Sequence, residues 1–196
     1  KTETFLNIVS ITLTKMKKEN NILEIFFNHP TKHWHFEEIL KIADISRPQA
    51  MQWLKKLIHK KIIIRIKQKR KMPYYIADYQ SSHYQIKKRL YALEHFEKTG
   101  FLEHLTSLSK ASTIILFGSF SRWDWHNESD IDIFLYGSTE GFDMNYYRKK
   151  LQREIQLFVC EDKEQLQKYN PALLKNIIEG YTIKGDLKFI EVKPHV

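Results

Sequence analysis

Apolar residues in the first part of the chain recur at helical spacing in three successive segments. The first predicted helix covers Asn20–His29 and ends before Pro30, which disfavours helical backbone in the residue before it. The second covers His35–Ala43. A third is predicted to begin at Ser46, because Ser46 and Gln49 match the S-x-x-Q capping box. The chain is therefore expected to open with a small helical domain.

After the third helix, the pattern changes to that of a β-hairpin. Lys61–Lys67 is rich in β-branched residues, Gln68–Met72 is a basic turn, and Pro73–Ala77 is the returning strand. Three helices followed by a hairpin resemble the winged helix-turn-helix, over about Asn20 to Asp78. This resemblance implies binding to double-stranded DNA, with the third helix in the major groove.

Charge supports a polyanionic partner for this part of the chain. Residues 1–110 carry 21 Lys/Arg and 10 Asp/Glu, whereas residues 111–196 carry 11 and 13. Ten basic and no acidic residues lie between Ile45 and Ala77. The side chains expected to contact DNA are Arg47, Gln49, Gln52, Lys55, Lys56, Lys69, Arg70 and Lys71. A solvated basic face, RNA binding or a protein partner are the alternatives.

Two strands with polar ends are predicted in the second half of the chain. Ser112–Phe117 is an apolar run closed by Gly118 and Ser119, and a second strand starts at Asp130 after ten intervening residues. The two-residue period places Asp130 and Asp132 on one strand face. Such a pair suits Mg²⁺, which binds one or two carboxylates together with phosphate oxygens.

These residues resemble the DNA polymerase beta type of nucleotidyltransferase, and in particular the minimal nucleotidyltransferases. The resemblance rests on the Gly-Ser, ten-residue gap, Asp-x-Asp pattern and covers about 112–196. It implies transfer of a nucleoside monophosphate from a Mg-NTP, with ATP expected, to a protein or small-molecule acceptor. It also implies that Gly118, Ser119 and Arg122 bind the triphosphate. A surface ion pair with Asp124 or Glu128 is the alternative role of Arg122.

One position departs from the family pattern. The family's third carboxylate is expected on the strand Arg153–Cys160, where Gln156 occupies the matching place and is a candidate neutral metal ligand. The metal on the nucleotide side is therefore expected to bind, whereas the metal that activates the nucleophile is expected to bind weakly, which would impair catalysis. The alternative function is a non-catalytic transcription regulator or antitoxin-like protein, with a toxin partner, whose degenerate domain binds nucleotide or a partner.

The predicted fold class is α+β, with a mixed sheet in the C-terminal domain. The predicted domains are 1–80, a winged helix-turn-helix; 81–110, a helical connector that could present a homodimer face; and 111–196, the nucleotidyltransferase. Trp123 and Trp125 are expected to pack on the connector helix Ser81–Lys98 more than to stack on a nucleobase. One cysteine and no long apolar run favour a cytoplasmic protein without a membrane segment.

Overall fold

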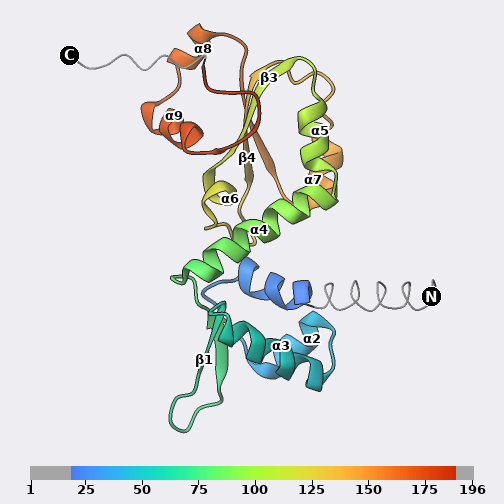
Figure 1. The fold of residues 1–196 in the computed structure, drawn as a ribbon, viewed down its shortest axis with the longest axis vertical. Coiled ribbons are helices and arrows are strands. Elements are labelled where there is room, and N and C mark those ends of the chain that lie inside the picture. Colours follow the sequence, from blue (N-terminus) through green and yellow to red (C-terminus); the bar gives the residue numbers. More distant parts are fainter. Residues whose placement is uncertain (1–18, 189–196) are drawn as a thin grey trace, which may run out of the picture. The chain divides into compact units, whose positions relative to one another are not determined.

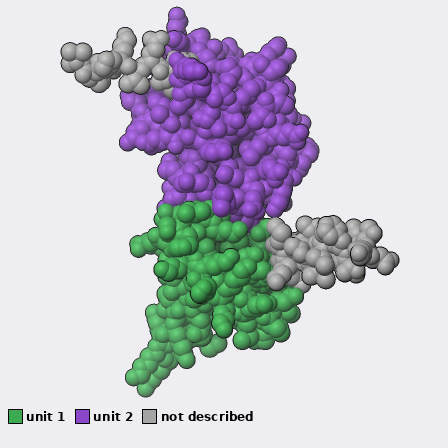
Figure 2. All heavy atoms as spheres, viewed as in Figure 1, with its two compact units in different colours: residues 1–88 green, residues 89–196 purple. Residues whose placement is uncertain are grey.

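The computed structural model describes residues 19–188, which fold into two compact units (Figure 2). The division falls between Lys88 and Arg89, within helix α4 (Ser82–Lys98). The sequence suggested a separate connector over 81–110 instead. Helix α4 itself, however, starts and ends within one residue of its expected bounds.

Unit 1 begins with three helical segments (Figure 1). Residues 19–28 are helical, followed by α2 (Phe36–Ala43) and α3 (Arg47–His59). The predicted capping box at the start of α3 is confirmed, since the backbone N–H of Ser46 donates to Oε1 of Gln49 at 3.3 Å. The buried residues of α3 are Ala50, Trp53, Leu54 and Leu57, which lie at helical spacing.

A β-hairpin follows α3 in unit 1, as the alternating pattern predicted. Strands β1 (Ile63–Ile66) and β2 (Tyr74–Ala77) pair antiparallel. Trp34, in the loop before α2, adds an antiparallel bridge to Tyr75 through two backbone hydrogen bonds of 2.8 and 2.9 Å. This bridge ties the loop that leads into α2 to the hairpin.

Unit 2 is built on a four-stranded mixed sheet with the order β5-β4-β3-β6. Its strands are β3 (Ala111–Phe117), β4 (Ile131–Gly137), β5 (Ile155–Cys160) and β6 (Tyr181–Lys184). Strand β3 pairs antiparallel with β4 and β6, whereas β4 and β5 are parallel. The predicted mixed sheet is therefore confirmed. The further strand expected over Lys188–Val192 lies beyond the described residues, apart from Lys188.

Helices cover both faces of this sheet. The helices of unit 2 that follow α4 are α5 (Phe101–Ser107), α6 (Gly118–Arg122), α7 (Met144–Leu151), α8 (Lys163–Gln167) and α9 (Pro171–Ile178). Leu166 of α8 and Ile177 of α9 pack in the core on one face, which also buries Cys160. No helix among the described residues is long and apolar enough to cross a membrane.

Candidate active site

The Gly-Ser turn lies directly against the second aspartate of the Asp-x-Asp motif. Gly118 opens α6 with a φ of +68°. A Cβ placed on this glycine would lie 2.0 Å from Oδ2 of Asp132 and 3.0 Å from its Cγ. Only a residue without a side chain allows this approach, and the φ value independently favours glycine. Gly118 therefore brings the start of α6 into contact with the carboxylate.

Strand register brings the polar ends of β3, β4 and β5 to one end of the sheet. Asp132 of β4 is the register partner of Phe117 on β3 and of Gln156 on β5. Asp130 lies immediately before β4. Burial and the negative charge of Asp130 together raise the pKa of Asp132 to about 6, against the lowering effect of the Arg122 charge. The two carboxylates are thus close enough to repel one another, which is typical of carboxylates that share a bound cation.

Gln156 contacts the aspartate pair through its side-chain amide. Its Nε2 donates to Oδ2 of Asp130 at 2.5 Å. Glu154, the carboxylate immediately before β5, instead forms an ion pair with Arg148 at 3.1 Å. Among residues 19–188, no group of three or more His, Cys, Asp or Glu side chains could hold a metal ion. The described site therefore offers two carboxylates and one neutral amide.

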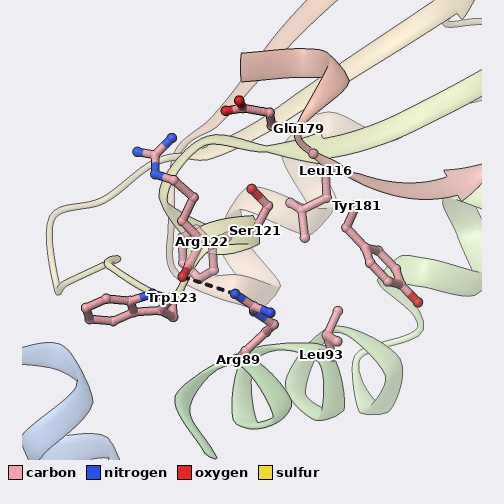
Figure 3. Close-up of a pocket in the computed structure, with 10 residues that line it drawn as sticks. Arg89, Leu93, Leu116, Ser121, Arg122, Trp123, Glu179 and Tyr181 are labelled. Atoms are coloured by element: carbon pink, nitrogen blue, oxygen red, sulfur yellow. Dashed lines mark hydrogen bonds between the residues drawn. The ribbon is translucent and has the colours of Figure 1, made fainter. Parts of the chain in front are cut away.

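Arg122 lines a hollow beside α6. Its Nε pairs with Oδ2 of Asp124 at 3.4 Å, and its charge also reaches Asp132. Figure 3 shows that the hollow lies beside α6, with Arg89 donating to the carbonyl oxygen of Arg122 at 3.4 Å. Its volume is 430 Å³, and its lining residues are Arg89, Leu93, Leu116, Phe120, Ser121, Arg122, Trp123, Glu179, Gly180 and Tyr181.

The loop that leads to Asp130 is held by a residue that sequence reasoning missed. Nη1 of Arg153 donates to the carbonyl oxygens of His126, Asn127 and Ser129 at 2.8, 2.9 and 3.2 Å. These contacts span 24 to 27 positions, so no local sequence pattern marks them. Arg153 is thus a positioning residue for the loop before β4.

The loop's tryptophans differ in their surroundings. Trp125 is buried, stacks on Phe120 with ring centroids 5.1 Å apart, and lies 6.4 Å from the Tyr91 ring of α4. Packing on this helix, the preferred expectation, is confirmed for Trp125. Trp123, with a φ of +92°, lines the hollow beside α6.

The candidate DNA-contacting side chains of unit 1 have different partners. Arg47 is exposed and pairs with Glu37 at 2.8 Å, while Lys56 pairs with Glu19 at 3.4 Å and lies over the Trp53 ring. Gln49 belongs to the capping box described above. The remaining candidates are exposed on α3 or in the hairpin turn, and these are Gln52, Lys55, Lys69, Arg70 and Lys71.

The described site thus combines a mixed sheet, a Gly-Ser turn against a carboxylate and the short helix α6. Residues 102–187 match the family model described as "Polymerase beta, Nucleotidyltransferase".

Among solved structures, the chain is similar to one described as a mutant of the toxin-antitoxin MntA-HpeT. The two share 16% identity with a TM-score of 0.31, and the match covers 50% of this chain and 73% of that one. No curated protein matches the chain.

Proposed function

We propose that unit 2 transfers a nucleoside monophosphate from a Mg-NTP to an acceptor, and that unit 1 binds double-stranded DNA. The observation that carries the first half is the packing of Gly118 on Asp132, so close that a Cβ on this glycine would lie 2.0 Å from Oδ2. It sets backbone N–H groups at the start of a helical turn beside a carboxylate pair. Bound triphosphate and bound cation would then be neighbours.

Asp130 and Asp132 are the proposed cation ligands. Two mutually repelling carboxylates, one of them half-buried with a raised pKa, fit a divalent cation because its charge would relieve the repulsion. The carbonyl oxygen of Gln156 is a further candidate ligand. When bound, the cation would neutralise negative charge on the triphosphate and polarise the reacting phosphorus.

Gly118, Ser119 and Arg122 are the proposed triphosphate-binding residues. The backbone at Gly118 has no side chain to obstruct a phosphate, and the Ser119 hydroxyl follows it directly. The Arg122 guanidinium already acts on Asp132 electrostatically, so it is near the place where phosphate and cation would meet.

Label transfer tests this proposal. The full chain is incubated with α-labelled NTPs, Mg²⁺ and a cell extract, beside an Asp130→Ala/Asp132→Ala variant. We expect label transfer that disappears in this variant and survives in Asp44→Asn, a matched control in unit 1 whose left-handed backbone (φ 50°) suits asparagine. Equal transfer by all three proteins would refute the assignment.

DNA binding by unit 1 rests on the exposed basic residues of α3 and the hairpin turn. Replacing Lys69, Arg70 and Lys71 by Gln should reduce the slope of log K against log salt by about 2–3, if each contacts one phosphate. A parallel Lys98→Gln variant, at the end of α4 in unit 2, serves as the control. A wild-type slope near zero would refute this part of the proposal.

A non-catalytic regulator is the second candidate, and Gln156 favours it. Gln156, whose side chain is a neutral amide, is the register partner of Asp132 and donates a hydrogen bond to Asp130. In that case unit 2 would bind nucleotide or a protein partner without turnover. Nucleotide binding without any label transfer, for all four NTPs, distinguishes this function from the first.

A further inference from the structure

The strand order gives the acceptor a direction of approach, if the proposed function holds. The triphosphate is assigned to the start of α6, which follows β3, and Asp130 and Asp132 belong to the neighbouring β4. An in-line displacement places the entering and leaving oxygens on opposite sides of the phosphorus. Since pyrophosphate leaves on the β3 side, the acceptor enters on the side of β5.

A second hollow lies on that side of the sheet. It has a volume of 400 Å³ and is formed by the loop before β4, the end of α7 and the residues that lead into β5. Asp130 lines it, so the hollow opens onto the first carboxylate of the Asp-x-Asp pair. Its lining residues are Asn127, Glu128, Ser129, Asp130, Arg148, Lys149, Gln152, Arg153 and Glu154.

Three basic and three acidic side chains line this hollow, and the exposed cation among them is Lys149. Arg148 is paired with Glu154, and Arg153 is hydrogen-bonded to the loop carbonyl oxygens. Lys149 is exposed and has no hydrogen bond or ion pair among the described residues. Asp130, in turn, receives the Gln156 amide and would be neutralised by the proposed cation. An anion beside Lys149 could therefore form an ion pair with its ammonium group.

The neutral side chain of Gln156 restricts which acceptor groups could react at this site. Its amide carries no charge and cannot accept a proton, yet it occupies the position next to Asp130 on the acceptor side. A hydroxyl acceptor must lose a proton as it attacks, whereas a phosphate monoester is largely a dianion at neutral pH, with a second pKa of about 6. An acceptor that is already anionic needs no base at this position.

We propose that the acceptor is a phosphate monoester, bound in the hollow beside Lys149. A terminal oxygen of the monoester forms the new bond to the α-phosphorus of the NTP. The bond from that phosphorus to the bridging oxygen of the β-phosphate breaks, and pyrophosphate leaves with the electron pair. No proton is transferred, and the product contains a new phosphoanhydride.

Binding without nucleotide tests the hollow by itself. Phenyl phosphate is titrated into the full chain and followed by ³¹P NMR, with wild type, Lys149→Gln and Lys150→Gln compared. Lys150 is the matched control, because it lies next in α7 but bonds the Tyr146 hydroxyl at 2.9 Å and does not line the hollow. We expect about tenfold weaker binding for Lys149→Gln only. Equal affinities for all three proteins overturn the site.

Transfer tests the acceptor chemistry. The wild type receives α-labelled ATP and Mg²⁺ with phenyl phosphate, benzyl alcohol, or a 3′-blocked duplex carrying either a 5′-phosphate or a 5′-hydroxyl. Label on the phosphates alone supports the proposal, and the small and nucleic-acid arms identify the source of the phosphate. Label on the hydroxyl acceptors overturns the phosphate-acceptor proposal. If the Glu128→Gln variant then no longer labels those hydroxyl groups, Glu128 is the base that accepts their proton.

The two proposals fail in different ways. No transfer to any acceptor, with or without extract, refutes the proposed function, while the titration still decides whether Lys149 forms an anion site. Transfer to hydroxyl groups alone keeps the proposed function and refutes the phosphate acceptor.

Discussion

Replacing Gly118 by alanine should damage unit 2 for two separable reasons. The first is backbone strain, because a φ of +68° costs an alanine about 1–2 kcal/mol relative to glycine. The second is overlap, because the new Cβ would lie 2.0 Å from Oδ2 and 3.0 Å from Cγ of Asp132. Relieving such an overlap in a packed site typically costs about 1–3 kcal/mol. The Gly118→Ala variant should therefore lose about 2–5 kcal/mol of unfolding free energy.

The double variant with Asp132→Ala separates the two costs. Removing the carboxylate leaves only the Cβ of residue 132, which lies 3.3 Å from the new methyl group and requires a small adjustment. In that background, Gly118→Ala should cost about 1–2 kcal/mol, the backbone part alone. The coupling energy of the cycle should accordingly be about 1–3 kcal/mol.

Urea unfolding of the four metal-free proteins, followed by far-UV circular dichroism and tryptophan fluorescence, measures this cycle. Each unit is fitted separately if two transitions appear, since two-domain chains need not unfold in one step. A Gly118→Ala cost that is the same with and without the Asp132 carboxylate would show that the two groups do not touch, and the site geometry would be wrong.

Three further predictions concern the neighbours of this contact. Arg153→Met removes three hydrogen bonds to the loop before β4 and should lower the unfolding free energy by about 1–3 kcal/mol, measured as a shifted urea midpoint; an unshifted midpoint would contradict the loop-holding role. Because burial and Asp130 raise the pKa of Asp132 to about 6, the folded state keeps a proton that the unfolded state loses between about pH 4 and 6. In the presence of a chelator, the unfolding free energy should therefore fall by about 1 kcal/mol as the pH rises through that range, a value reduced because solvent screens the half-exposed carboxyl. The Asp132→Asn variant should not show this fall. Gln156→Glu replaces a donor 2.5 Å from Asp130 with a third negative charge, so its melting temperature should drop in chelator and recover with Mg²⁺; the same melting temperature as wild type in both buffers would argue against this contact.

The parts of the fold that sequence reasoning predicted well depend on neighbours close in the chain. The capping box of Ser46 and Gln49 needs only a spacing of three residues, and the hairpin needs only alternation around a turn. The Gly-Ser turn and the Asp-x-Asp pair were found for the same reason, since each is a short motif at the end of an apolar strand.

The parts that were missed depend on contacts between distant residues. Arg153 was expected only as the start of a strand, because nothing near it in sequence indicates that it binds carbonyl oxygens before β4. The division of the chain within α4 also depends on such contacts. A continuous helical pattern over 82–98 contains no signal of which residues pack on unit 1 and which on unit 2.

The burial of the central strand explains why the candidate site residues lie at one end of the sheet. Ile131, Ile133 and Leu135 of β4 are fully buried, and β3 and β5 cover that strand on both sides. A charged group in the middle of this strand would lose its hydration without compensation, so polar groups are tolerated only where the strands end. At that end, Gln156 supplies a hydrogen bond to Asp130 where a carboxylate would have added repulsion. Without a cation the amide therefore stabilises the aspartate pair.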